Sequence, residues 1–319
     1  ATNVSSCQTM GSAGIYTLNQ SVSGAVHIGG DDICINIDHD DVIFDCQGYS
    51  ITGSGTRDYG IYTTHNSNNI TIKNCPSISR YPTGVYIYDS RNALINVTAF
   101  NNTDRGIYIR SGADSCSLTN VTAYFNTNYG ISVNSGSNNL SKITAYNNSY
   151  GVRIDDSGNK LINVTAFNNT NYGLWVSDDN NNLTNATVYK NGIYGLYLDN
   201  VNNIIVDAGS AYNNARDGIR IENDGNIVIR NFRIFGNLGN GTFTTQSTAN
   251  LSNVVFYNNS VDFLFERTSG TRTVSFTNVL FDNPLGNLQN FTNITLFDDA
   301  SSANVKYVIR WSGSPAPIT

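Results

Sequence analysis

A segment of about 22 residues recurs along most of this chain, and its regular spacing restricts the possible folds more than any other feature. Each copy has the frame Asn-Val-Thr-Ala-Phe/Tyr-Asn-Asn, a short turn, Gly-Ile-x-Ile, another turn and Asn-Asn-Leu. One copy begins at Asn96 and another at Asn163. The glycine that opens the second run stands at Gly60, Gly84, Gly106, Gly130, Gly151, Gly173, Gly195 and Gly218. Such a period predicts a solenoid, in which each repeat buries its apolar face only against its neighbours.

The repeat is typical of short strands joined by turns. Apolar residues alternate with polar or aromatic ones, as at Val97 and Ala99 and again at Ile107 and Ile109. Asn, Gly, Asp and Ser fill the gaps, and these residues tolerate the left-handed backbone of tight turns. We therefore predict an all-β, single-domain parallel β-helix of about 12 coils, which would form a rod about 55–60 Å long.

The repeat also predicts the limits of the coils and their interior. Residues 1–41 are expected to form an N-terminal cap, residues 42–295 the coils, and residues 296–319 a C-terminal strand and tail that cap the stack or dock on a partner. One interior column is predicted to be Ala99, Ala123, Ala145, Ala166, Val188, Ala211, Ile234 and Phe256. The pairs Asn138-Asn139, Asn181-Asn182 and Asn202-Asn203 precede the next strand, which predicts an internal asparagine ladder at this bend.

The cysteines indicate an oxidising compartment. Cys46 and Cys75 occupy matching places in successive coils, so stacking brings their Cα atoms to within disulfide range. We favour the pairs Cys46–Cys75 and Cys7–Cys34, although four cysteines allow three pairings. Cys116 is left over at the asparagine bend, where a buried free thiol is expected.

Charge and glycosylation motifs narrow the possible partners. Charged residues make up 13% of the chain and the net charge is −6, which argues against nucleic acid, and no apolar stretch approaches the length of a membrane span. The sequence holds 49 asparagines and 17 Asn-x-Ser/Thr motifs. We expect N-linked glycans on several of these motifs, and the candidate sites are Asn69, Asn101, Asn139, Asn147, Asn168, Asn182, Asn240 and Asn258.

Aromatic residues recur at two outward positions of the repeat. One column contains Phe100, Tyr124, Tyr146, Phe167, Tyr189, Tyr212, Phe235 and Tyr257, and the other contains Tyr62, Tyr86, Tyr108, Trp175 and Tyr197. Stacked rings stabilise neighbouring strands, which is one interpretation. A long bare aromatic stripe is also unusual on a monomer, so these columns are candidate surfaces for copies of the same chain or for a polysaccharide.

The Asn-Asn-x-Ile-x-Asn…Gly-Ile-x-Ile coils of residues 42–295 resemble the repeats of right-handed β-helix proteins, namely the pectin-lyase-like, NosD-like and carbohydrate-binding or sugar-hydrolase proteins. The opening Asp45-Cys46-Gln47-Gly48-Tyr49 is similar to the first coil of archaeal surface β-helix proteins. The resemblance implies the right-handed fold. It implies little about activity, because the repeat encodes stacking rather than chemistry.

The catalytic motifs of the resembling enzymes are largely missing. Asn102-Thr103-Asp104 and Asp178-Asp179 match two polygalacturonase elements, but Gly-His-Gly, Arg-Ile-Lys and the epimerase motif Asp-Pro-His-Glu are absent. A pectate-lyase-like site would need carboxylates for calcium and an arginine base. The candidates are Asp155, Asp178 and Asp199 for calcium, and Arg153, Asp178 and Arg220 for catalysis. Three scattered histidines and one methionine do not indicate a copper site.

Three functions follow as hypotheses. The first is a non-enzymatic, glycosylated subunit of a cell-surface layer, sheath or filament that assembles with copies of itself. The second is a carbohydrate-binding adhesin, and the third a polysaccharide lyase or hydrolase. All three place the chain outside the cell or on its surface, without a cofactor other than calcium.

Overall fold

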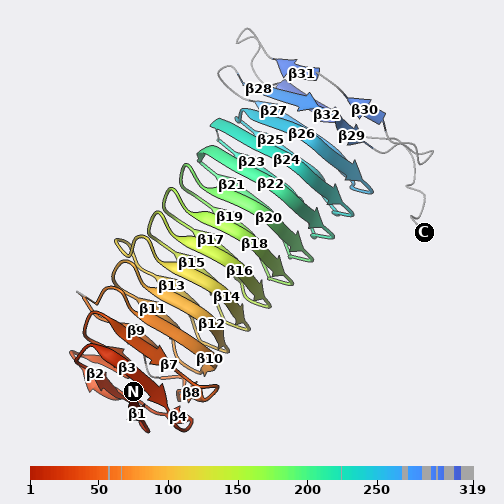
Figure 1. The fold of residues 1–319 in the computed structure, drawn as a ribbon. Coiled ribbons are helices and arrows are strands. Elements are labelled where there is room, and N and C mark those ends of the chain that lie inside the picture. Colours follow the sequence, from red (N-terminus) through yellow and green to blue (C-terminus); the bar gives the residue numbers. More distant parts are fainter. Residues whose placement is uncertain are drawn as a thin grey trace. The chain divides into compact units, whose positions relative to one another are not determined.

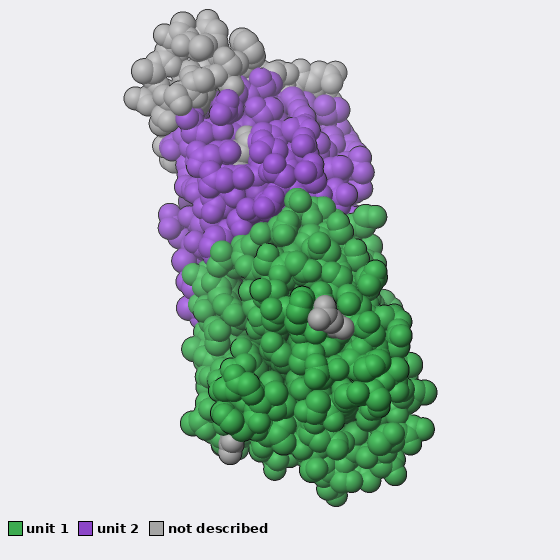
Figure 2. Space-filling model, turned by 90° about the vertical axis from the view of Figure 1, so that its left-hand side faces the viewer, with its two compact units in different colours: residues 1–165 green, residues 166–319 purple. Residues whose placement is uncertain are grey.

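The protein is an all-β solenoid of about 12 turns, as the repeat predicts (Figure 1). The structure is a computed structural model that describes residues 1–56, 58–65, 67–223, 225–267 and 272–281, and three further strands at 289–291, 294–297 and 305–309. No helix of the described residues is long and apolar enough to cross a membrane. The chain divides into two compact units, Ala1–Thr165 and Ala166–Thr319 (Figure 2), and the division falls within β18 (Lys160–Phe167).

In the first unit the strands form two sheets, sheet A and sheet B. The sheet A strands are β1 (Thr2–Val4), β3 (Gly14–Leu18), β4 (Val22–Ser23), β7 (Val42–Asp45), β8 (Ser50–Thr52), β10 (Thr71–Ser79), β12 (Ala93–Phe100), β14 (Ser117–Tyr124) and β16 (Asn139–Tyr146). The sheet B strands are β2 (Gln8–Met10), β5 (Val26–Ile28), β6 (Asp31–Ile37), β9 (Tyr59–Thr63), β11 (Thr83–Ile87), β13 (Arg105–Ile109), β15 (Tyr129–Val133) and β17 (Tyr150–Ile154).

The second unit repeats this alternation. Its sheet A strands are β20 (Asn182–Tyr189), β22 (Asn202–Tyr212), β24 (Gly225–Phe235), β26 (Ala249–Tyr257), β28 (Thr273–Thr277), β29 (Val279–Phe281), β30 (Gln289–Phe291) and β31 (Ile294–Phe297). Its sheet B strands are β19 (Leu174–Val176), β21 (Leu196–Asp199), β23 (Ile219–Glu222), β25 (Asn240–Thr245), β27 (Val261–Arg267) and β32 (Val305–Ile309). β32 pairs antiparallel with β27, so the strand predicted near the C-terminus joins sheet B, whereas residues 310–319 lie outside the described residues.

Equivalent strands of successive coils pair in parallel and in register, which places identical positions above one another. In the first unit Ala99 pairs with Ala123, and Ala123 with Ala145. In the second unit the same position enlarges from Ala211 to Ile234 and Phe256. All members of the predicted interior column are fully buried, so this prediction is confirmed.

Two buried asparagine ladders line the bends, and the sequence pattern identified only one of them. In the missed ladder, the Asn102 side-chain amide donates to Asn126 Oδ1 at 3.0 Å and that of Asn126 donates to Asn148 Oδ1 at 3.1 Å. Each amide also donates to a backbone carbonyl and accepts from a backbone N–H, as Asn102 does with Ile78 and Tyr81. The second unit has the same arrangement at Asn169, Asn191, Asn214, Asn237 and Asn259.

The predicted ladder is only partly as expected. Asn138 is buried, and its Oδ1 accepts the Cys116 backbone N–H at 2.7 Å. Asn181 is also buried, but Asn202 and Asn203 are exposed, and the strand register places the buried Ile204 at the ladder position instead. The extra residue in this turn shifts the asparagine pair outward, which the pairwise pattern did not reveal.

The repeat glycine is required by the close approach of adjacent coils. A Cβ atom at Gly106 would lie 2.6 Å from the Gly130 carbonyl oxygen and 2.7 Å from the Asn126 amide nitrogen. Real Cβ atoms do not approach other atoms this closely, so any side chain would push the coils apart. This contact explains why the glycine recurs in every regular coil.

The N-terminal residues and the cysteines complete the first unit. Residues 1–41, predicted as a cap, contain strands that already stack in parallel with the later coils, since β3 pairs with β7 and β6 with β9. The disulfides Cys7–Cys34 and Cys46–Cys75 are present with Cα–Cα distances of 4.4 and 4.8 Å, as the favoured pairing predicts. Cys116 is free and buried.

Candidate functional site

The outward side of sheet B in the first unit carries a compact group of tyrosines. Tyr62 pairs with Tyr86, and Tyr86 with Tyr108, so the three rings stand in one column with centroid distances of 5.0 and 5.1 Å. Tyr59 lies 4.9 Å from Tyr62, and Tyr88 lies 6.3 Å from Tyr86. We call these five half-buried rings, together with Arg105 and Arg110, the tyrosine face.

The two arginines of the tyrosine face lie over its rings. The guanidinium of Arg105 is 4.4 Å from the centre of the Tyr108 ring, and that of Arg110 is 4.1 Å from the centre of Tyr88. Arg105 also lies 3.6 Å from the carboxylate of Asp104. Arg110 donates to the Ser111 carbonyl at 3.4 Å and forms no ion pair with a carboxylate of the described residues. No carboxylate in the described part of the chain therefore neutralises its positive charge directly.

The phenol groups of the face are potential hydrogen-bond donors to a ligand. Burial, with smaller contributions from nearby charges, raises the pKa of Tyr59, Tyr62 and Tyr86 to about 12. None of the five hydroxyls of the face hydrogen-bonds to another residue that the structure describes. Flat rings with free hydroxyls beside arginines suit a polar ligand that has apolar faces.

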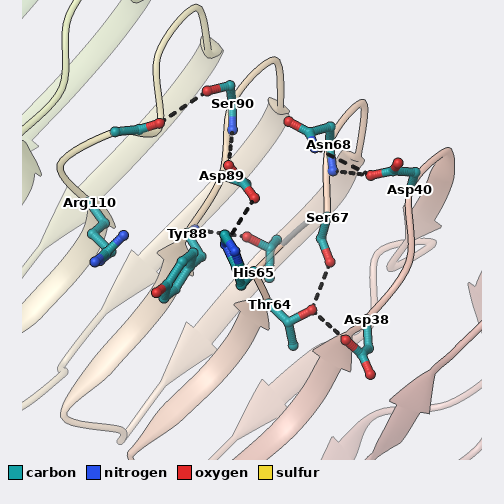
Figure 3. A network of polar contacts seen from close by, with 12 residues as sticks. Asp38, Asp40, Thr64, His65, Ser67, Asn68, Tyr88, Asp89, Ser90 and Arg110 are labelled. Atoms are coloured by element: carbon teal, nitrogen blue, oxygen red, sulfur yellow. Dashed lines mark hydrogen bonds and ion pairs between the residues drawn. The ribbon is translucent and has the colours of Figure 1, made fainter.

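A polar network borders the tyrosine face at the adjoining bend (Figure 3). His65 Nδ1 lies 3.7 Å from Asp89 Oδ2, and the imidazole is 5.6 Å from the Tyr88 ring. The Thr64 hydroxyl donates to Asp38 Oδ1 at 2.6 Å. These contacts connect the bends of successive coils beside Tyr88.

The second unit has an aromatic cluster of a different kind. Trp175 and Tyr197 stack at 5.9 Å, but Tyr197 is only 9% exposed and its hydroxyl donates to Glu222 Oε2 at 2.7 Å. Arg220 Nε donates to Glu222 Oε1 at 2.6 Å, and its guanidinium lies 3.7 Å from the Phe243 ring centre. Arg220 is thus engaged by groups of its own unit, so this cluster favours a structural role more than a binding role.

Arg153, a candidate base, is held in a similar way in the first unit. Its Nε donates to Asp155 Oδ1 at 2.7 Å and its NH1 group donates to the Tyr129 hydroxyl at 2.8 Å. Burial lowers the pKa of Arg153, but the bonds and charge of Asp155 and Tyr129 outweigh it and leave the pKa above its ordinary value. A guanidinium that holds its proton more firmly is not favoured as a general base.

The three carboxylates proposed for calcium accept hydrogen bonds near their own turns. Asp155 accepts from Arg153, Asp178 from the Asp179 backbone N–H at 2.7 Å, and Asp199 from the Asn200 amide at 2.6 Å. Among the described residues no group of three or more His, Cys, Asp or Glu side chains could hold a metal ion. Calcium binding stays a prediction without geometric support.

The other aromatic column lies on sheet A and is stacked almost face to face. Phe100, Tyr124 and Tyr146 in the first unit have centroid distances of 4.9 Å and interplanar angles of 3–4°. The rings of the second unit, from Phe167 through Tyr189, Tyr212 and Phe235 to Tyr257, are 4.5–4.8 Å apart. Every ring is half-buried by its neighbours, which supports the stabilising interpretation.

The sequence pattern identified only part of the tyrosine face. Tyr62, Tyr86 and Tyr108 were expected from the Gly-x-x register, whereas Tyr59, Tyr88, Arg105 and Arg110 were not singled out. Tyr59 and Arg105 occupy the position just before the coil glycine, and Tyr88 and Arg110 follow the strand by one residue. These positions could have been found by extending the column to both ends of each strand.

Two family profiles match the chain. The profile described as periplasmic copper-binding protein (NosD) matches residues 3–192, and the one described as right handed beta helix region matches residues 150–296. The right-handed β-helix expected from the coils is thereby confirmed. No curated protein matches the sequence.

Several solved structures share the fold. The mannuronan C-5 epimerase AlgE4 A-module of Azotobacter vinelandii is 14% identical, with 78% of this chain and 76% of that chain covered and a TM-score of 0.54. The periplasmic alginate epimerase AlgG is 13% identical, with 77% of this chain and 74% of that chain covered and a TM-score of 0.57. The Dettilon tailspike protein is 13% identical, with 87% of this chain and 64% of that chain covered and a TM-score of 0.50. At these identities the likeness shows the fold alone.

The copper in the profile's description does not fit the residues present. Copper sites are built from clustered histidine, cysteine and methionine ligands. Here His27 pairs with Asp32, His65 lies beside Asp89, and Met10 is buried. Burial raises the pKa of the Cys116 thiol to about 11, which disfavours the thiolate that would bind a metal.

Proposed function

The chain belongs to the family described as periplasmic copper-binding protein (NosD), and we propose that it is an exported protein that binds a polysaccharide on its tyrosine face. Export is supported by the family description and by the two disulfides, which persist in oxidising compartments. A location outside the cell or on its surface, as in the archaeal proteins that the first coil resembles, is part of this proposal.

The observation that carries the proposal is the set of five tyrosine hydroxyls without a protein hydrogen-bond partner among the described residues. They lie on rings within about 5–6 Å of one another, beside the unneutralised Arg110. Sugar rings present apolar faces that stack on aromatic side chains and hydroxyls that bond to polar tips. The column of Tyr62, Tyr86 and Tyr108 repeats one ring over three successive coils, which suits a chain of repeated sugar units.

The charge of the face favours an acidic polysaccharide. Arg110 has no acidic partner in the described part of the chain, and Arg105 has one at 3.6 Å. Guanidinium groups bind carboxylate and sulfate oxygens through charge-assisted hydrogen bonds. The epimerases that share the fold are named for alginate and mannuronan, which are acidic polysaccharides, and this agrees with the proposed ligand class.

A binding screen tests the proposal. Immobilised protein is exposed to soluble alginate, polygalacturonate and a neutral β-glucan at low and at high salt. We expect the two acidic chains to bind at low salt, with weaker binding at high salt because surface charge is screened. Absence of binding to all three would refute the proposal, and stronger binding of the neutral glucan would refute the acidic ligand class.

Self-assembly into a surface layer, sheath or filament is a second candidate function. It is favoured by Phe125, which is 57% exposed and lies 5.5 Å from Tyr124 in the stacked column, and by Leu238, which is 75% exposed. A contiguous exposed apolar patch often marks a contact between copies, and Phe125 adds an exposed ring beside the stacked column. Electron microscopy of the native preparation tests it: ordered polymers are expected, and only separate molecules would contradict it.

A further inference from the structure

We propose that Asn101, Asn147 and Asn168 carry N-linked glycans in the exported protein. Each is the first asparagine of an Asn-Asn-Thr or Asn-Asn-Ser turn that follows a stacked aromatic residue. Each has a left-handed backbone, with φ of 53°, 55° and 53°. The three residues therefore occupy the same bend of their coils.

The bend holds these side chains outward because the next asparagine is anchored inward. Asn102, Asn148 and Asn169 are 1–2% exposed and belong to the buried ladder. The preceding asparagines are left outside this ladder: Asn101 and Asn168 are exposed and Asn147 is half-buried. The backbone of the bend is bonded to the next coil, as in the bond from the Asn101 N–H to the Tyr124 carbonyl at 3.1 Å. A glycan at this bend would leave those backbone bonds intact.

Glycosylation requires an available amide nitrogen. The nitrogen of the asparagine side chain forms a bond to C1 of a sugar carried on a lipid phosphate or diphosphate, and the bond from that carbon to the phosphate oxygen breaks. The amide loses one proton, and the lipid phosphate leaves with the electron pair of the broken bond. Among the described residues, the side chains of Asn101, Asn147 and Asn168 form no hydrogen bond. Their amide nitrogens are therefore open to this reaction.

At other Asn-x-Ser/Thr motifs the side-chain amide nitrogen already donates a hydrogen bond. The amide of Asn69 donates to Asp41 at 2.6 Å, and that of Asn240 donates to Asp217 at 2.8 Å. In an outer ladder the amide of Asn96 donates to Asn74 at 3.1 Å and that of Asn120 to Asn96 at 2.8 Å. A sugar on any of these nitrogens would displace the neighbouring coil's side chain. We expect these four sites to be unmodified in the folded protein.

The remaining sequons of the expected set are not part of the proposal. Asn139 and Asn182 are exposed, but they lie in β16 and β20, where adjacent strands are about 4.8 Å away and flank the side chain. Asn258 has the same turn motif as the three proposed sites, with φ of 55°.

Glycopeptide mass spectrometry of the protein purified from its source organism tests the proposal. Site occupancy is measured at the three proposed asparagines and at Asn69, Asn96, Asn120 and Asn240. We expect glycans on the first group and none on the second. Unmodified peptides at all three proposed sites would overturn the proposal, and so would equal occupancy of the two groups.

A pair of variants expressed in the same organism separates the motif from the fold. Thr103 is exposed, so neither Thr103→Ala nor Thr103→Ser should change the melting temperature. Thr103→Ala should abolish the glycan at Asn101, whereas Thr103→Ser should retain it because the hydroxyl at this place is kept. A glycan that persists in Thr103→Ala would contradict the assignment. The outcome is independent of polysaccharide binding.

Discussion

The guanidinium of Arg110 lies 4.1 Å above the centre of the Tyr88 ring and makes no ion pair with a carboxylate of the described residues. Arg153 and Arg220 differ, because carboxylate oxygens lie 2.7 Å and 2.6 Å from their Nε atoms. An arginine that is held by an aromatic ring keeps its charge and its remaining donors for a ligand. This difference separates a surface that can bind from clusters that stabilise the coils.

Replacing a buried ladder asparagine should destabilise the solenoid strongly. Asn126→Ala removes the acceptor of the buried Asn102 backbone N–H and of one of the two hydrogen bonds that the Asn102 side-chain amide donates. We expect a loss of about 3 kcal/mol in the free energy of unfolding, because each unsatisfied buried group costs about 1–3 kcal/mol. Denaturant unfolding measures it, with the exposed Asn139→Ala as control. A similarly small loss in the free energy of unfolding for both substitutions would contradict a stabilising role of the ladder.

The repeat glycine should be intolerant of even one added carbon. Gly106→Ala places a Cβ atom 2.6 Å from the Gly130 carbonyl oxygen, so two coils must separate. We expect this variant to melt at a clearly lower temperature or to be insoluble, since overpacking typically costs about 1–3 kcal/mol or more. The control is Gly11→Ala, where no atom lies within 4 Å of the new Cβ. Equal melting temperatures of the two variants would argue against the close approach.

The thiol of Cys116 should be unreactive in the folded protein. Burial is the main cause that raises its pKa to about 11, so little thiolate forms at pH 8. A disulfide reagent such as Ellman's reagent should label no thiol in the native protein and one per chain in guanidinium chloride, because the other four cysteines form disulfides. Rapid labelling of the native protein would show that the thiol is accessible.

The tyrosine face should make the fold sensitive to strong alkali. The pKa of Tyr59, Tyr62 and Tyr86 is raised to about 12 in the folded protein, mainly by burial, above the ordinary value of 10.0. The unfolded chain therefore loses these protons first. Their contribution to stability is complete below about pH 10 and is lost as the pH rises toward about 12.

A single-ring substitution isolates this effect. Tyr86→Phe keeps the ring and removes the ionisable hydroxyl, so its melting temperature at pH 11.5 should fall less, relative to pH 8, than that of the unmodified protein. Tyr49→Phe, at an exposed ring just before β8, is the control and should behave as the unmodified protein does. If all three proteins lost the same number of degrees, burial of Tyr86 would not be the cause.

The coil frame, the interior column and both disulfides could be predicted from the sequence, because stacking in register places residues one period apart side by side. The direction in which individual asparagine side chains point could not be predicted from the sequence. Asn101 and Asn102 both tolerate tight turns, and only the three-dimensional bend decides that Asn102 is buried while Asn101 is exposed. The same ambiguity hid the replacement of the ladder asparagine by Ile204 in the coil after Asn181.

The tyrosine face was harder to predict than the fold. Tyr62, Tyr86 and Tyr108 follow the repeat, but Arg110 gains its role from a ring in the neighbouring coil and from the absence of a nearby carboxylate among the described residues. Arg153 is also an arginine on the sheet B side, but Asp155, two positions later, neutralises its charge. Such differences depend on side-chain directions that periodicity alone does not contain.

Polysaccharide binding on the tyrosine face is tested most directly by isothermal titration calorimetry of alginate against four proteins. These are the unmodified chain, Tyr86→Ala, Arg110→Gln and Tyr124→Ala. Tyr124 is the matched control, because it is a half-buried, stacked tyrosine on the other sheet. We expect Tyr86→Ala and Arg110→Gln each to weaken binding at least about tenfold, or about 1.4 kcal/mol, and Tyr124→Ala to leave it unchanged. Equal binding by all four proteins, or loss in Tyr124→Ala alone, would contradict a polysaccharide site on the tyrosine face.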